Sequence, residues 1–133
     1  MRSSARETVF KFLFAKLFNP QDDELFTAIA RDEKLSEKDF DFAKKLLKTV
    51  QDGFDGFMSD IERLVKGYKL DRVYNTDKCI LIIGMAELKN FIDTPVPVII
   101  DEEVKLAAKY STDKSTDFVN GILAEYAQEV RNG

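Results

Sequence analysis

The 133-residue sequence predicts an all-α protein. Apolar residues recur at helical spacing in almost every segment, and no segment alternates apolar and polar residues as a half-buried strand would. Proline, asparagine and glycine divide the chain into about seven such segments. With 44% hydrophobic residues, the chain is long enough for one domain, or for two very small halves that share a core.

Four helices are expected in the first half, over residues 4–18, 24–34, 36–53 and 54–66. The first is apolar around well over half of its circumference, which is typical of a helix at the centre of a bundle. Ser36 is placed to cap the third helix, and Asp39 follows three residues later as the acid of a capping box. The fourth helix is expected to end near Gly67.

Three helices are expected in the second half, over residues 76–92, 97–110 and 115–131. The helix over 76–92 is the most apolar after the first. Pro95 and Pro97 permit no helix before residue 97, because proline fixes its own backbone and disfavours helix at the residue before it. The last helix begins after the polar run Ser111–Lys114.

Charge and cysteine content limit the class of protein. The net charge of −4 argues against an unspecific nucleic-acid binder, because such proteins carry a broad basic surface. Residues 1–18 are locally positive and residues 19–41 strongly negative, so an anionic partner is expected at the N-terminal end. One cysteine, no signal-peptide pattern and no apolar run near the roughly 20 residues of a membrane span predict a cytoplasmic protein without a membrane segment.

Catalysis has little support in this composition. The chain has no histidine, a single cysteine and no glycine-rich phosphate loop, so the usual nucleophile, base and zinc-ligand sets are absent. The acidic run Asp101–Glu103 lies near an expected helix start, where carboxylates complement the helix dipole. A binding role without a metal or other cofactor is therefore expected.

The last helix contains Asn120 and Gly121, although glycine in a helix interior costs roughly 1 kcal/mol relative to alanine. Gly121 lies one turn after Phe118, which sits at the margin of the apolar stripe. A ring beside a position without a side chain could hold a stacked base. The simpler interpretation, which the spacing alone favours, is that Gly121 lets another helix approach and Phe118 packs against it.

The first helix has a related feature. Arg2 and Arg6 fall on the same line as its buried apolar residues, so they require either partner carboxylates or an opening at the end of the bundle. An opening would suit phosphate binding. Lys11 lies on the narrow polar arc, where it is either a phosphate ligand or an ordinary solvated lysine.

Five blocks of the sequence resemble the NusB family of transcription antitermination factors. The blocks are "ARE" (5–7), "LDR" (70–72), "DKCILIIGMAEL" (77–88), "VPVIIDEEVKLAAKY" (96–110) and "STDFVNGIL" (115–123). They cover essentially the whole chain in the family's order, and the Phe-Val-Asn-Gly run followed by an aliphatic pair is the most specific of them.

The resemblance implies one NusB-like domain of two small packed helical bundles, about 1–68 and 69–133, without catalysis. Family members bind the boxA segment of ribosomal RNA leader transcripts together with NusE, a small-subunit ribosomal protein, and join an RNA polymerase complex that resists termination. Carried onto this chain, the resemblance implies an RNA-binding set and a NusE-binding set. The first comprises Arg2, Arg6, Lys11, Phe14, Lys114, Ser115 and Phe118, and the second Asp77 and Glu87.

The sequence also departs from the family pattern. Lys11 stands where glutamine is common and Phe14 where tyrosine is common, so an aromatic platform remains without its hydroxyl. The N-terminus is less basic than in typical members. A NusB-like domain also begins certain ribosomal RNA cytosine methyltransferases, but no glycine-rich cofactor loop follows here. Two alternatives stay open. The chain could be a helical module that binds only protein, and the free chain could be a monomer or a homodimer.

Overall fold

The computed structural model describes residues 2–18, 23–66 and 72–131, which form helices and connecting turns without a strand. The helices are α1 (Arg2–Phe18), α2 (Asp23–Asp32), α3 (Glu37–Asp52), α4 (Phe54–Leu64), α5 (Asn75–Asn90), α6 (Val96–Tyr110) and α7 (Ser115–Arg131). The predicted all-α class is confirmed, and every predicted helix is present with bounds within two residues of the expected ones. The expectation of no helix before residue 97 is wrong, because α6 begins at Val96 and Pro97 lies in its first turn, where a missing backbone N–H costs no intrahelical bond. The expected helix end at Gly67 lies outside the described residues.

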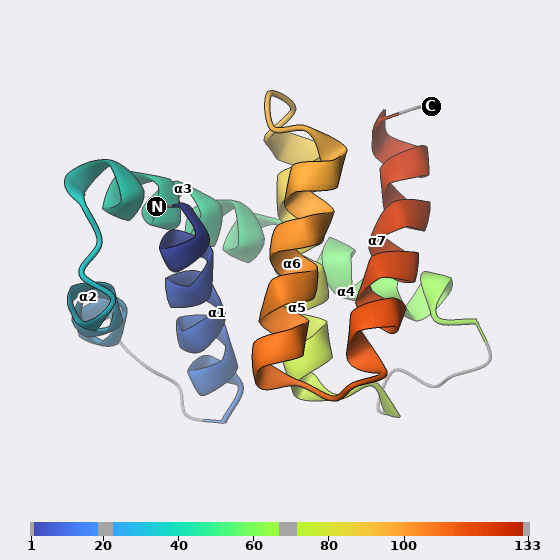
Figure 1. Ribbon diagram of the computed structural model, residues 1–133, viewed down its shortest axis with the longest axis horizontal. Coiled ribbons are helices and arrows are strands. Elements are labelled where there is room, and N and C mark those ends of the chain that lie inside the picture. Colours follow the sequence, from blue (N-terminus) through green and yellow to red (C-terminus); the bar gives the residue numbers. More distant parts are fainter. Residues whose placement is uncertain (1, 19–22, 67–71, 132–133) are drawn as a thin grey trace.

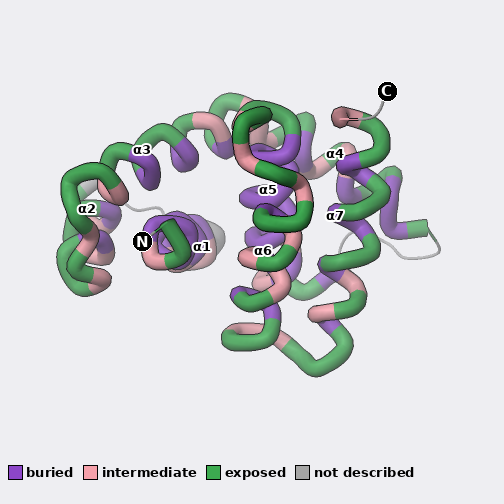
Figure 2. The backbone as a smooth tube through the Cα atoms, turned by 45° about the horizontal axis from the view of Figure 1, so that its top comes forward, coloured by how far each residue is buried: buried purple, intermediate pink, exposed green. Residues whose placement is uncertain are grey.

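Helix α5 is the centre of the arrangement, with α1 and α3 on one side and α6 and α7 on the other (Figure 1). It contacts α1, α3, α4, α6 and α7. All residues from Cys79 to Leu88 are buried, and the coils of α5 that are visible in Figure 2 have the colour of buried residues. A helix that is apolar on all sides is stable only when other helices surround it, which explains its position. Helix α1, expected at a bundle centre, packs against α2, α3 and α5.

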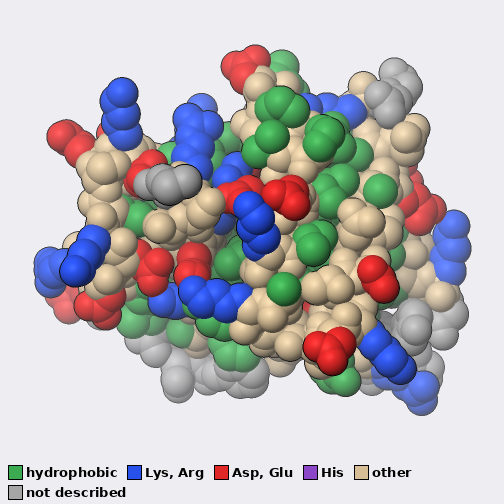
Figure 3. All heavy atoms as spheres, viewed as in Figure 1, with side chains coloured by type: hydrophobic (Ala, Val, Ile, Leu, Met, Phe, Trp, Pro, Cys, Tyr) green, Lys and Arg blue, Asp and Glu red, His purple; other side chains and the backbone are tan. Residues whose placement is uncertain are grey.

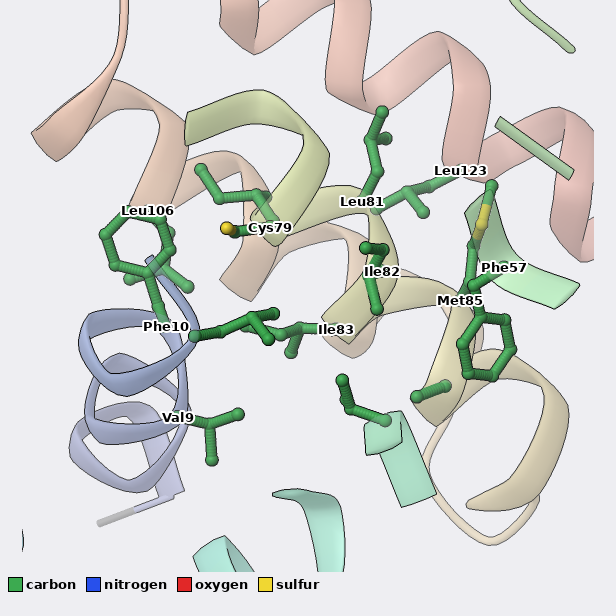
Figure 4. Close-up of a cluster of buried hydrophobic side chains, with 14 of the residues drawn as sticks. Val9, Phe10, Phe57, Cys79, Leu81, Ile82, Ile83, Met85, Leu106 and Leu123 are labelled. Atoms are coloured by element: carbon green, nitrogen blue, oxygen red, sulfur yellow. The ribbon is translucent and has the colours of Figure 1, made fainter. Parts of the chain in front are cut away.

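The buried apolar side chains form one cluster to which every helix contributes. Figure 4 shows Val9 and Phe10 of α1 near Ile83 of α5, and Leu123 of α7 near Leu81 of α5. Gly84 permits the close approach of α7, because a Cβ atom there would lie 2.7 Å from Leu123 Cδ1. The absence of a side chain at position 84 of α5 therefore allows α7 to pack closely against α5.

The helix ends use local and distant hydrogen bonds. The predicted cap is confirmed, since the Ser36 hydroxyl accepts a hydrogen bond from the Asp39 backbone N–H at 3.1 Å. At the other end of the chain, the Arg131 guanidinium donates to the carbonyl oxygens of Leu88, Phe91 and Thr94. These carbonyls lie at and beyond the C-terminus of α5, where no further helix turn satisfies them. Arg131 thus ties the last turn of α7 to the α5–α6 connection.

Candidate nucleic-acid interface

The nine predicted site residues fall in three places rather than two. Arg2, Arg6 and Glu87 lie where the start of α1 meets the end of α5. Lys11 and Phe14 lie further along α1. The remaining four residues, Asp77, Lys114, Ser115 and Phe118, lie together where α5 and α7 begin, at the lower edge of the view in Figure 1.

Arg6 and Glu87 bind each other inside the protein. Two guanidinium nitrogens of Arg6 donate to the Glu87 carboxylate, at 2.7 Å from Nη2 and 2.8 Å from Nε. Arg6 is 3% exposed and Glu87 is fully buried. The structure therefore differs from the expectation that Arg6 reaches RNA phosphate and Glu87 faces a protein partner. Of the two alternatives for an arginine on a buried stripe, the partner carboxylate is the one found.

Two further carboxylates from α6 complete this charged cluster. Glu102 accepts a hydrogen bond from Arg6 at 3.3 Å and another from the Ser3 hydroxyl. Glu103 is fully buried, lies 3.9 Å from Arg6 Nε, and has no hydrogen-bond donor among the described residues. Burial, followed by the negative charge of Glu87, raises the pKa of Glu103 well above its ordinary value. Arg6 thus lies between three carboxyl groups, those of Glu87, Glu102 and Glu103.

The other predicted residues of α1 are only partly available to a ligand. Arg2 is exposed, but its guanidinium carbon lies 4.5 Å from the centre of the Phe42 ring of α3. Lys11 Nζ lies 2.6 Å from a Glu33 carboxylate oxygen, which raises the pKa of Lys11 and neutralises much of its charge. Phe14 is half-buried, with its ring stacked 6.0 Å from that of Phe10. RNA would have to compete with these intramolecular partners.

Asp77 and Ser115 are also inside the protein. Asp77 is 4% exposed and accepts hydrogen bonds from the hydroxyls of Ser111 and Ser115, at 2.7 Å and 2.9 Å. Ser115 is 2% exposed, and its oxygen lies 2.9 Å from that of Thr112. The expectations of partner contact for Asp77 and RNA contact for Ser115 do not match these positions. The network instead holds the α6–α7 turn against the start of α5.

Above this network lies a pocket with a volume of about 210 Å³. Its walls carry two exposed cations, Arg72 and Lys114, and two aromatic rings, Tyr74 and Phe118. Phe118 is half-buried against the core, as expected for the margin of the stripe, whereas Tyr74 is 60% exposed. The sequence interpretation missed Arg72 and Tyr74 as site residues. "LDR" is visible as a motif, but helical periodicity gives no direction for side chains in a connecting segment.

Gly121 does not serve helix packing. A Cβ atom built at Gly121 would meet no heavy atom within 4 Å, and both Gly121 and Asn120 are exposed. The favoured interpretation, in which the glycine admits another helix, is therefore wrong. The second half of the Phe-Val-Asn-Gly run is a surface feature one turn from the pocket.

Charges of both signs share the surface around these residues. Figure 3 shows acidic and basic side chains interspersed on the face viewed, with apolar side chains gathered over α6 and α7. Lys109, for example, pairs with Glu7 at 2.8 Å. No group of three or more acidic or cysteine side chains suited to a metal ion occurs among residues 2–18, 23–66 and 72–131. Within these ranges, too, every helix is too short or too polar to cross a membrane.

Comparison with known proteins places these features in a family. The profile of the NusB family matches residues 3–128. A protein of a Nitratiruptor species named transcription antitermination protein NusB is 34% identical over 133 residues, which cover 99% of this chain and 95% of the relative. A protein of the same name from Methylacidiphilum infernorum is 36% identical over 124 residues, covering 92% and 87%.

Solved structures agree with the sequence comparison. NusB of T. maritima superposes with a TM-score of 0.89 at 30% identity, covering 97% of this chain and 92% of that one. A chain in a crystal structure of the antitermination factors NusB and NusE in complex with dsRNA superposes with a TM-score of 0.84 at 27% identity, covering 96% of each chain.

Proposed function

Since the chain belongs to the NusB family, we propose that it is a transcription antitermination factor that binds boxA RNA of ribosomal RNA leader transcripts together with NusE. In this role it joins the RNA polymerase antitermination complex in the cytoplasm and catalyses no reaction. The names of its relatives and the similar chain solved with NusE and dsRNA support the proposal.

The observation that carries the RNA-binding role is the pocket at the start of α7. It combines exposed cations with aromatic rings on an otherwise acidic chain. Cations attract phosphates, and rings stack on unpaired bases without selecting one sequence. Of the predicted RNA-binding residues, Lys114 and Phe118 meet this description directly. Ser115 supports them from beneath through its bond to Asp77.

The interspersed charges explain why a protein partner is needed. Affinity for nucleic acid rises with the number of phosphates that basic side chains neutralise, and some of the basic side chains here are already paired with carboxylates. Lys11 and Lys109 already hold carboxylates of the same chain. We propose that NusE adds contacts to the same RNA, so that the pair binds more tightly than either protein alone.

The NusE-binding role of Asp77 and Glu87 then becomes indirect. Both side chains are buried, one near each end of α5. Asp77 positions the α6–α7 turn and Glu87 positions α1 through Arg6. We propose that these two residues maintain the shape of the partner surface and do not touch NusE themselves.

The test is a titration of fluorescently labelled boxA RNA with and without NusE, read by anisotropy. The wild-type chain should bind, and NusE should raise the affinity. Lys114→Glu should weaken binding. Lys48→Glu should not, because Lys48 is also exposed but lies on α3 and does not line the pocket. The two variants carry the same net charge, so a difference between them reports position.

The alternative is a helical module that binds only protein. It predicts that NusE binds the chain in a calorimetric titration. It also predicts that boxA RNA does not bind the chain, and that the RNA binds the chain–NusE pair no more tightly than it binds NusE alone. That result would remove the RNA role and keep the family assignment.

A further inference from the structure

We infer that the pocket at the start of α7 holds one unpaired nucleobase of the bound RNA, with the rings of Tyr74 and Phe118, which both line the pocket, as its stacking surfaces. The inference rests on the proposed RNA-binding function and assigns a role to two residues, Tyr74 and Arg72, outside the family motif that contains Phe118. It makes the pocket a single-nucleotide site rather than a general attachment point for the RNA backbone.

Tyr74 has a fixed backbone and an exposed ring. Its carbonyl oxygen accepts the Lys78 N–H at 2.9 Å as the first bond of α5, and its φ and ψ of −58° and 142° place it at the N-cap of that helix. Its side chain makes no cap hydrogen bond, and the residue is 60% exposed. The side chain makes no cap bond and most of the ring is open to solvent, so its face is accessible to a base.

Two other large apolar residues are comparably exposed in the described ranges, Ile92 and Val98. Both lie in or near the α5–α6 connection, at the opposite end of α5 from Tyr74. Tyr74 differs from them because it lines a pocket together with a second ring and two cations. All three residues expose apolar surface, but only Tyr74 among them lines a pocket that also holds a second ring and two cations, which is the combination that suits a nucleotide.

The size and the polar groups of the pocket fit one nucleotide. Its volume of about 210 Å³ lies below the roughly 300–1,000 Å³ of pockets for larger ligands. Arg72 and Lys114 are exposed on its walls, where they can reach the phosphates on either side of a bound base.

The floor of the pocket carries one acidic group, Asp77. Each of its carboxylate oxygens accepts a serine hydroxyl, from Ser111 and Ser115. These bonds give both carboxylate oxygens a partner within the chain. The Thr112 hydroxyl, bonded to Ser115, supplies a polar edge beside the rings. A base with polar edges and flat apolar faces matches this lining.

The test uses boxA RNA in which single positions carry the fluorescent base 2-aminopurine, bound to the chain with NusE present. Stacking on an aromatic ring quenches this fluorophore, so one position should be quenched by the wild-type chain. Tyr74→Ala should abolish that quenching and weaken RNA binding by between about 5-fold and 150-fold, the range for the loss of one stacked base. Tyr74→Phe keeps the ring and should retain both properties. Ile92→Ala, which removes a side chain of similar exposure elsewhere, is the control.

The outcomes separate this inference from the proposed function. If the wild-type chain binds RNA, and Tyr74→Ala keeps both the affinity and the quenched position, the single-nucleotide site is wrong and the RNA-binding function stands. If the wild-type chain fails to bind RNA with NusE present, both are wrong. Tyr74→Ala should unfold at the same temperature as the wild type, because no cap hydrogen bond is lost. An unchanged unfolding temperature assigns any loss of RNA affinity to the missing ring.

Discussion

The charged cluster around Arg6 and the pocket beside Lys114 contain the same kinds of residue but use them in opposite ways. In the cluster, Arg6 is enclosed and its hydrogen bonds go to carboxylates of the same chain. At the pocket, Arg72 and Lys114 are exposed at the rim of an open hollow. Burial, rather than residue type, separates a cation that stabilises the fold from one that can serve a ligand.

The two glycines that face these regions differ in the same way. Gly84 lies in the packed centre of α5, where a Cβ atom would be 3.0 Å from Glu103 Cγ and even nearer to Leu123. Gly121 lies on the surface of α7, where a Cβ atom would meet nothing. The cost of a glycine in a helix is offset by packing at the first position. At the second position the fold offers no such compensation.

The largest effect is expected from removing Arg6. Arg6→Ala should lower the free energy of unfolding by about 3–5 kcal/mol, because the Glu87 carboxylate is left buried without its partner. Urea denaturation followed by circular dichroism measures this loss. Glu87→Lys should be at least as damaging, since it places two cations together in the interior.

A double variant distinguishes structure from ligand contact at Arg6. Arg6→Met with Glu87→Leu replaces the ion pair by apolar groups and should recover most of the lost stability. If Arg6 is purely structural, this folded double variant binds boxA RNA as the wild type does. Weakened RNA binding by a stable double variant would restore Arg6 to the phosphate-binding set.

A smaller loss is expected at Gly84. Gly84→Ala should destabilise the protein by about 1–3 kcal/mol, because the added methyl group overlaps the buried Leu123 side chain. Gly56→Ala in α4 is the matched control, since a Cβ atom there has no neighbour within 4 Å. It should leave stability unchanged or raise it slightly. Equal stability of the two variants would show that α7 can move away from α5 without cost.

The raised pKa of Glu103 predicts a dependence of stability on pH. Its pKa is raised in the folded chain, so the folded state binds a proton more tightly than the unfolded state, where the value is near 4.5. Stability must then fall as the pH rises from about 4.5 towards the raised value, by at most about 1.4 kcal/mol per pH unit. Glu103→Gln should remove this fall, because an amide side chain does not titrate in this pH range. Identical pH profiles for the wild type and Glu103→Gln would contradict a raised pKa of Glu103.

Glu102 works in the opposite direction and serves as an internal comparison. Although burial acts to raise its pKa, the bonds from Ser3 and Lys105 and the charge of Arg6 lower it. The stability that Glu102 contributes is therefore present above its ordinary pKa and is lost as the pH falls through the lowered value. It remains in both proteins, so the difference between their profiles isolates Glu103.

Local patterns predicted most of the fold, whereas tertiary contacts decided the site. Helix bounds and the Ser36 cap depend on residues within a few positions of each other, so the sequence shows them directly. Arg6 and Glu87 are 81 positions apart in the sequence. The helical spacing of Arg6 predicted that it needs either a carboxylate partner or an opening, but it could not identify Glu87 as that partner. The environment of Gly121 likewise depends on where the other helices lie. A helical wheel places a residue on a face but does not show what covers that face.

The smallest change in stability, and the most direct test of the surface motif, is expected from Gly121→Ala. Alanine should raise the stability of the chain by up to about 1 kcal/mol, because it favours the helix and the added methyl group meets no neighbour. The same methyl group stands one turn from Phe118 and should hinder a ligand that approaches the ring, so boxA RNA binding should weaken. Gly56→Ala should show the gain in helix stability without any change in RNA affinity. If Gly121→Ala stabilises the protein and binds RNA as tightly as the wild type does, RNA does not approach this side of α7, and the RNA surface is confined to the Tyr74 side of the pocket.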